Sequence, residues 1–181
     1  MKEKNEAEGG IMVTKKILLI LPCTKKKPYT SSPTWRYIMK HLGPWKKYVS
    51  LAAVDCITDP KTGKPFGIVT VENQHLTINR DEKPDPSKLP VLVQEVRKKL
   101  KKLSKNYDHI IAYINVKAYW KALEQIQDEF EICMLPKAYR NLKKWNNAKI
   151  GPIGMFKTSV GELVETIKEL VGTNENTEGN R

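Results

Sequence analysis

The sequence contains few cysteines and no apolar run long enough to cross a membrane. Its three cysteines, Cys23, Cys56 and Cys133, lie far apart and show neither a Cys-x-x-Cys pair nor the Cys/His spacing of a zinc site. This pattern argues against a disulfide framework and against a structural metal. The apolar run 17–21 is too short for a signal peptide or a membrane span. We therefore expect a cytoplasmic protein that binds no metal and contacts no membrane.

Acidic residues and nucleotide-binding motifs are also scarce. The chain has no Gly-x-Gly-x-x-Gly, no P-loop lysine motif and no His-Glu-x-x-His, so we expect no cofactor. Its 20 acidic residues stand against 32 lysines and arginines, which gives a net charge of +12. Such an excess is typical of proteins that bind nucleic acid. The alternative is the lysine- and glutamate-rich surface of a heat-adapted protein, which explains many charges but not their imbalance.

The length and the distribution of apolar residues predict one domain. A chain of 181 residues is long enough to bury a core of its own. Segments 1–12 and 173–181 contain little that a core could bury, so we expect both to be disordered tails. The folded domain is then expected to span residues 13–172.

Within this domain, apolar runs alternate with helical patterns. The expected strands are 17–21, 48–56, 109–114 and 130–135, and a hairpin or irregular excursion is expected over 67–78. The expected helices are 33–42, 89–104, one that Asn115 caps, and one from the capping box Ser159-x-x-Glu162 to Gly172. The alternation predicts an α/β fold, a three-layer α/β/α sandwich with a mainly parallel central sheet.

Ligands of such sheets bind at the carboxyl ends of the strands. The loop that follows the first strand, from Pro22 to Ser32, is the most reactive of the candidates. It contains a thiol at Cys23, three consecutive lysines and the phenol of Tyr29. Cations beside a thiol lower its pKa, which predicts a nucleophile near neutral pH. The alternative is that Cys23 is an inert core residue, that the lysines are solvated and that Tyr29 packs against the next helix.

The spacing in this loop resembles a known signature. Pro-Cys, three residues, Lys-Pro-Tyr, two residues and Ser resembles the motif of the archaeosine synthase family. The matching positions are Pro22, Cys23, Lys27, Pro28, Tyr29 and Ser32. The family continues with two residues and a histidine, whereas this chain has Trp35 at that position. The close match covers about fourteen residues of the chain.

The resemblance implies a fold and an activity. The motif domain of the family looks like the uracil-DNA-glycosylase type of α/β/α sandwich. Family members act on tRNA that carries a cyano-deazaguanine base, and they add the amine of free lysine to the nitrile. Full-length members also carry a C-terminal RNA-binding domain, which this chain lacks, so a protein partner that supplies such a domain is one expectation.

On this basis we assign candidate roles. The catalytic candidates are Cys23, Lys27, Tyr29 and Ser32. The substrate-binding candidates are Pro22, Lys25, Lys26, Pro28, Trp35 and Asp55. Either the Cys23 thiolate or an amine attacks the nitrile carbon, while Tyr29 or a lysine donates the proton. Trp35 cannot transfer a proton, but an exposed indole stacks on a base.

Two basic clusters are the candidate contacts to tRNA or another nucleic acid. The first comprises Arg97, Lys98, Lys99, Lys101 and Lys102. The second comprises Lys137, Tyr139, Arg140, Lys143, Lys144 and Trp145. Lysine and arginine interleaved with aromatic residues suit looped RNA. The alternative functions are a non-catalytic nucleic-acid-binding module and an accessory subunit with the same fold.

Overall fold

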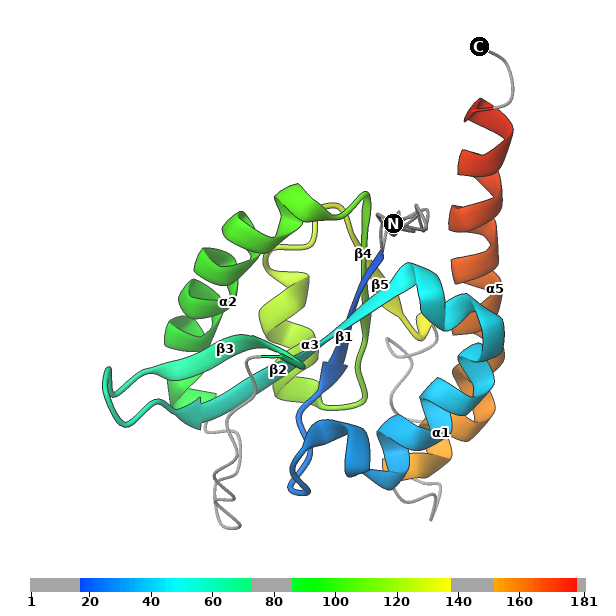
Figure 1. The fold of residues 1–181 in the computed structure, drawn as a ribbon. Coiled ribbons are helices and arrows are strands. Elements are labelled where there is room, and N and C mark those ends of the chain that lie inside the picture. Colours follow the sequence, from blue (N-terminus) through cyan, green and yellow to red (C-terminus); the bar gives the residue numbers. More distant parts are fainter. Residues whose placement is uncertain (1–16, 73–85, 138–151, 179–181) are drawn as a thin grey trace, which may run out of the picture.

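The central element of the structure is a five-stranded mixed sheet. The computed structural model describes residues 17–72, 86–137 and 152–178, so the expected tail 1–12 lies outside the described residues (Figure 1). The strands are β1 (Ile17–Pro22), β2 (Val49–Thr58), β3 (Pro65–Thr70), β4 (His109–Tyr113) and β5 (Ile132–Leu135). Their order in the sheet is β3-β2-β1-β4-β5. All pairs are parallel except β2 with β3, which forms the antiparallel edge.

Helices cover both faces of this sheet. The helices are α1 (Pro33–Leu42), α2 (Leu89–Leu103), α3 (Lys117–Glu124) and α5 (Pro152–Glu178). Helix α1 packs against α5, and α2 packs against α3 and β3, so the two pairs lie on opposite sides of the sheet (Figure 1). The predicted α/β fold with a mainly parallel sheet and flanking helices is therefore confirmed.

Strand β1 occupies the middle of the sheet because its sequence is apolar on both faces. All five residues from Ile17 to Leu21 are fully buried. A continuous apolar run suits a parallel strand that helices cover on both sides, as the sequence predicted. The central position of β1 places the loop that follows it at the middle of the sheet's carboxyl edge.

The antiparallel edge depends on one glycine. Gly67 in β3 has a φ of 73°, and a Cβ built there would lie 2.9 Å from the carbonyl carbon of Glu95 in α2. Only glycine allows this conformation and this close approach of helix to strand. The described part of the expected excursion 67–78 therefore forms no hairpin of its own: residues 67–70 are the end of β3, which pairs with the earlier strand β2, and residues 73–78 lie outside the described ranges.

The last helix differs from the sequence prediction at both ends. The capping box at Ser159 is wrong, because α5 already begins at Pro152, which stands at a position where proline starts helices well. Ser159 lies inside the helix, where its hydroxyl makes a 2.7 Å hydrogen bond with the Tyr113 hydroxyl. The predicted end at Gly172 is also wrong, since residues 173–178, expected to be part of a disordered tail, continue the helix.

Candidate active site

The candidate site lies where the chain connections leave the sheet in opposite directions. From β1 the chain passes through α1 to β2 on one side, and from the neighbouring β4 it passes through α3 to β5 on the other. Such a switch point leaves a crevice at the carboxyl ends of the two strands, where α/β proteins bind ligands. Cys23 stands at this point, with its backbone N–H bonded to the Val54 carbonyl of β2 at 3.1 Å.

Lys27, Tyr29 and Asp55 form a buried ionic network beside Cys23. The Lys27 ammonium lies 3.3 Å from Asp55 Oδ2, and the two side chains are 2% and 0% exposed. The Tyr29 hydroxyl donates to the same Asp55 oxygen. The backbone N–H of Ile57 donates to the other oxygen, Oδ1, at 2.9 Å. A buried carboxylate is tolerated only with partners of this kind, so the network neutralises Asp55 within the fold.

An irregularity in β2 accompanies this network. The pairing with β3 shifts register between Asp55 and Thr58. Bulges in strands are common beside functional sites, because the extra residue re-aims a neighbouring side chain. Here the irregularity follows directly after Asp55, whose carboxylate reaches Lys27 and Tyr29 of the loop after β1.

A second cluster joins two thiols through one phenol. The hydroxyl of Tyr119, near the start of α3, lies 3.0 Å from Cys23 Sγ and 3.2 Å from Cys56 Sγ. We did not single out Tyr119 or Cys56 as functional from the sequence. Their positions at the carboxyl ends of strands are the signal that could have found them. Cys56 is near the carboxyl end of β2, and Tyr119 is in α3, which follows β4.

The expected low pKa of the Cys23 thiol is wrong. Burial and, after it, the negative charge of Asp55 raise the pKa of Cys23 from 9.0 to about 12, although the Tyr119 hydrogen bond and Lys27 oppose the shift. The cationic loop does not dominate because Lys27 is already paired with Asp55, and Lys25 and Lys26 are exposed. At neutral pH the group is therefore a thiol.

The phenols of this region share the same environment. Burial and then the charge of Asp55 raise the pKa of Tyr29 above its ordinary value. Burial raises the pKa of Tyr119 as well, followed by the effects of Cys23 and Cys56. Both side chains therefore carry their protons at neutral pH, and both can act as hydrogen-bond donors.

Trp35, at the position of the family histidine, is part of the core. Its side chain is fully buried, and its ring stacks on Tyr29 with centroids 5.0 Å apart. The indole N–H donates to the Pro22 carbonyl at 3.1 Å. The predicted stacking of Trp35 on a substrate base is not compatible with this position. Instead, the residue fixes Tyr29 and the end of β1.

The remaining loop residues have simpler surroundings. Ser32 is buried and stands at the amino-terminal cap of α1, as the sequence predicted, but its side chain makes no capping hydrogen bond. Pro28 is exposed, and its carbonyl accepts bonds from the N–H and hydroxyl of Ser31 at 2.9 and 2.8 Å. Lys25 and Lys26 are exposed, with the Lys26 carbonyl accepting from Thr24 Oγ1 at 2.9 Å.

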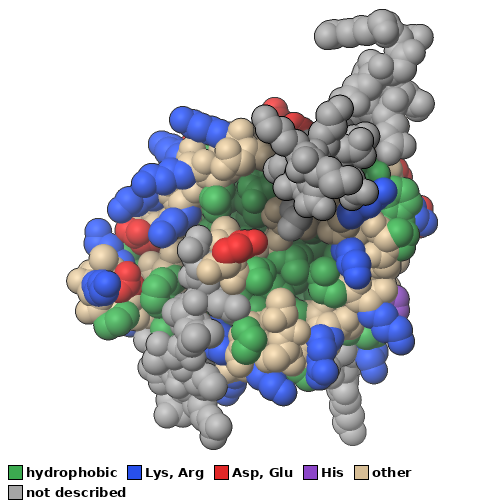
Figure 2. All heavy atoms as spheres, in the orientation of Figure 1, with side chains coloured by type: hydrophobic (Ala, Val, Ile, Leu, Met, Phe, Trp, Pro, Cys, Tyr) green, Lys and Arg blue, Asp and Glu red, His purple; other side chains and the backbone are tan. Residues whose placement is uncertain are grey.

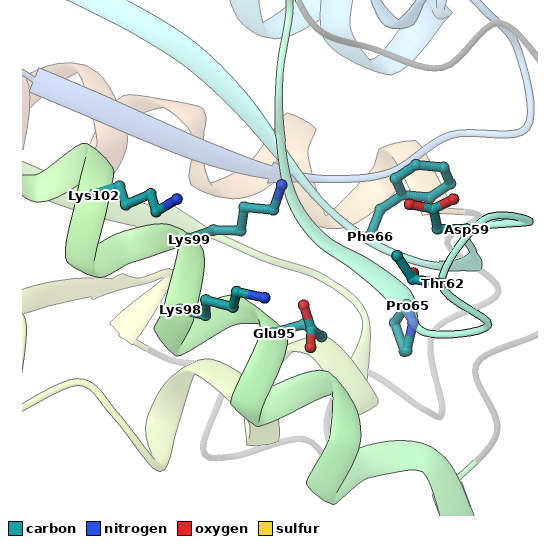
Figure 3. Close-up of a pocket in the computed structure, with 8 residues that line it drawn as sticks. All are labelled: Asp59, Thr62, Pro65, Phe66, Glu95, Lys98, Lys99 and Lys102. Atoms are coloured by element: carbon teal, nitrogen blue, oxygen red, sulfur yellow. The ribbon is translucent and has the colours of Figure 1, made fainter.

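The first basic cluster divides into two sets on α2. Arg97 Nε lies 2.7 Å from Glu129 Oε2, and Lys101 Nζ lies 3.7 Å from the other oxygen of the same carboxylate. A different set lines a groove beside β3 (Figure 3): Lys98, Lys99 and Lys102. Basic side chains gather over the region of α2 in Figure 2.

Only one member of the second cluster is described. Lys137 is exposed, and its backbone N–H donates to Glu162 Oε1 at 3.1 Å. The others lie outside the described residues: Tyr139, Arg140, Lys143, Lys144 and Trp145. Among the residues that the structure describes, no group of three or more histidine, cysteine or acidic side chains could hold a metal ion. No helix in these ranges is both long and apolar enough to span a membrane.

Comparisons with known proteins give little further information. No protein-family model matches the chain, and no curated protein matches it. A crystal structure of AF0587, a protein of unknown function, is similar with a TM-score of 0.43 and 16% sequence identity. The similarity covers 74% of this chain and 45% of that one, so this chain spans less than half the length of AF0587. A likeness at this level indicates no activity.

Proposed function

We propose that the protein forms an amidine on tRNA, by adding the amine of free lysine to the nitrile of a cyano-deazaguanine base. The observation that carries the proposal is the convergence of the motif residues at one point. Cys23, Lys27 and Tyr29 are brought together with Asp55 at the carboxyl ends of β1 and β2. This is the place where α/β sheets bind their ligands.

In this proposal Cys23 is the attacking group. Lys27 is held by Asp55 and lies over the Tyr29 ring, 3.7 Å from its centroid, so its ammonium is a fixed charge rather than a free nucleophile. Cys23 is only partly buried, and no residue in the described ranges forms an ion pair with it. The Lys27–Asp55–Tyr29 network then positions the loop, and Trp35 supports Tyr29 from behind.

Because Cys23 is a thiol at neutral pH, its addition to a nitrile requires that the thiol proton leaves sulfur as the carbon–sulfur bond forms. The sulfur bonds to the nitrile carbon while the thiol proton moves to the nitrile nitrogen, which gives a thioimidate. Tyr119, which contacts Cys23 Sγ at 3.0 Å, is placed to pass this proton on. The lysine amine then attacks the same carbon, the carbon–sulfur bond breaks, and the amine proton returns to sulfur. The products are the amidine and the free thiol.

The basic surface supplies the RNA contacts in this proposal. Exposed Lys25 and Lys26 lie next to the site and are suited to the phosphates that flank the target base. Lys98, Lys99 and Lys102 of α2 extend the RNA-binding surface, whereas Arg97 and Lys101 of the same helix pair with Glu129 and are not part of it. A tRNA substrate also places the protein in the cytoplasm.

Mass analysis of tRNA that carries cyano-deazaguanine tests the proposal. Wild-type protein with free lysine is expected to increase the mass of the base by one lysine, and omission of lysine abolishes the gain. Cys23→Ala removes the nucleophile and Lys27→Ala breaks the network, so both are expected to lose turnover while keeping RNA affinity. Cys133→Ser, in β5, is the matched control and keeps activity. Full turnover by Cys23→Ala and Lys27→Ala contradicts the proposal.

A second candidate function is a nucleic-acid-binding module without catalysis, either alone or as an accessory subunit. The buried indole of Trp35 favours it, because the position of the family histidine holds no group that transfers protons. This candidate predicts tight, salt-dependent tRNA binding with no mass gain. As an accessory subunit, the protein would gain turnover when a partner that supplies the RNA-binding domain is added.

A further inference from the structure

A basic groove runs between α2 and β3, outside the site described above. Two adjoining pockets, of about 260 and 320 Å³, share the lining residues Asp59, Phe66, Lys99 and Lys102. In Figure 3 the lysines extend from α2 toward the hairpin that carries Asp59 and Phe66. The adjoining pockets together form one groove, which we call the α2–β3 groove.

Of the residues that the structure describes, none forms an ion pair with the lysines of this groove, Lys98, Lys99 and Lys102. Arg97 and Lys101 on the same helix differ, because Glu129 pairs with both. Helix α2 therefore presents a partly neutralised set, Arg97 and Lys101, beside the one carboxylate of Glu129, and an uncompensated set toward β3. Uncompensated lysines attract phosphate groups.

The two acidic side chains in the groove are already engaged. Glu95 Oε1 lies 3.8 Å from the Lys64 ammonium, and Asp59 Oδ1 accepts the backbone N–H of Lys61 at 2.8 Å within the β2–β3 turn. Glu95 lines only the pocket beside the hairpin turn, whereas Asp59 lines both. The pocket nearest Leu103 is thus lined by two lysines, Lys99 and Lys102, and one carboxylate, and a phosphate is favoured beside its lysines.

The wall opposite the lysines is apolar. The larger pocket is bordered by Phe66, Ile68 and Val69 of β3 and by Leu103 of α2. An apolar wall faced by cations is complementary to a nucleotide, whose base is largely apolar on its faces and whose phosphate is anionic. The pocket volume of about 320 Å³ lies within the range of small-ligand sites.

We propose that the α2–β3 groove holds one nucleotide of a bound RNA strand, with its phosphates on Lys99 and Lys102 and its base against the β3 wall. The choice of RNA as the ligand rests on the proposed function. The residues that line the groove do not include Cys23, so binding there does not depend on it. The groove also connects to the site through β2, because Asp55 belongs to this strand and Asp59 follows its last residue, Thr58. An RNA strand bound in the groove therefore lies beside the carboxyl end of β2.

Salt-dependent binding of a labelled single-stranded oligouridylate, about 12 nucleotides long, tests the proposal. The double variant Lys99→Ala/Lys102→Ala removes two phosphate contacts, so the slope of log affinity against log salt is expected to fall by about 1.4. Arg97→Ala/Lys101→Ala is the matched control, since it removes the same charge from the same helix. Its slope is expected to stay at the wild-type value.

Equal losses of slope in the two double variants would overturn the proposal, because they would show an effect of net charge alone. An unchanged slope in Lys99→Ala/Lys102→Ala would overturn it too. The outcome is separable from that of the proposed function. If the slope of Lys99→Ala/Lys102→Ala is unchanged while lysine is still added to tRNA, only the groove proposal is refuted. If the slope falls as expected but tRNA gains no mass, the groove proposal is supported and the proposed catalysis is refuted.

Discussion

Two consecutive residues of β2, Asp55 and Cys56, belong to two different kinds of cluster. Asp55 contacts Lys27 and Tyr29 of the segment that leads into α1. Cys56 contacts Tyr119 of α3, which also contacts Cys23. The first cluster is ionic and buried. The second, which we call the thiol cluster, consists of two thiols and a phenol, and Cys23 and Tyr119 in it carry their protons at neutral pH.

The difference between the clusters shows two ways in which polar side chains are accommodated at the buried carboxyl end of the sheet. A charge out of water is stable only with a close counter-charge and further hydrogen bonds, and Asp55 has both. A thiol in a similar place simply keeps its proton, as the raised pKa of Cys23 indicates. The ionic cluster therefore holds the loop in place, while the thiol cluster holds Cys23, the thiol that we propose as the nucleophile.

The largest effect is expected from breaking the ionic cluster. Asp55→Ala leaves the Lys27 ammonium, 2% exposed, without its partner and removes the acceptor of Tyr29. Because an uncompensated buried charge is strongly unfavourable, the free energy of unfolding is expected to fall by about 3–5 kcal/mol. Urea unfolding followed by circular dichroism measures the change.

The double variant Asp55→Asn/Lys27→Met is the control for this prediction. It removes both charges together, so it is expected to be more stable than Asp55→Ala by at least about 1 kcal/mol. A double variant no more stable than Asp55→Ala would contradict the assignment of the loss to an unpaired charge.

A smaller effect separates the two phenols. Tyr29→Phe removes a hydrogen bond to a carboxylate and is expected to cost about 1.5–3 kcal/mol. Tyr119→Phe removes only contacts to two thiols, so its cost is expected to stay near 1 kcal/mol or below. The same urea titration measures both variants. A larger fall in the free energy of unfolding for Tyr119→Phe than for Tyr29→Phe would contradict this prediction.

The smallest effect concerns pH. The pKa of Cys23 is raised from 9.0 to about 12 in the folded protein, so the native state keeps a proton that the unfolded chain releases above pH 9. The contribution is fully present below pH 9 and is lost as pH rises toward 12. Between pH 8 and pH 10, the free energy of unfolding of the wild-type protein is expected to fall by about 1.4 kcal/mol more than that of Cys23→Ser.

Urea unfolding at pH 8 and pH 10 gives this difference directly. Cys133→Ser measures the corresponding contribution of a thiol elsewhere in the sheet, because burial raises the pKa of Cys133 as well. An equal fall in the free energy of unfolding for wild type and Cys23→Ser would mean that Cys23 ionises in the folded protein as it does in the unfolded chain. That result would contradict the assignment of a protonated Cys23 to the thiol cluster.

Much of this arrangement can be read from local sequence. The run 17–21 predicts β1, the Ser32-Pro33 pair predicts the start of α1, and the position of the loop after β1 predicts that Cys23 and Lys27 lie at the sheet's carboxyl edge. These features follow from periodicity, capping preference and the rule for strand ends. Each depends on a few neighbouring residues.

The rest depends on contacts between distant segments. Tyr119 reaches Cys23 across 96 positions of sequence, and no local pattern marks that pairing. The direction of the Cys23 pKa was predicted wrongly because three adjacent lysines dominate the sequence, whereas in the fold Lys27 is neutralised by Asp55. The start of α5 was missed because Ser159 fits a cap but bonds Tyr113 instead.

The most direct test of the central claim, that the Cys23 thiol attacks the nitrile, is the intact mass of the protein after incubation with free cyano-deazaguanine and no lysine. We expect a covalent adduct with the mass of the base in wild type and in Cys56→Ser, located on Cys23 by peptide mapping and absent from Cys23→Ser. An adduct on a lysine, or amidine formation on tRNA by Cys23→Ser, would contradict the claim.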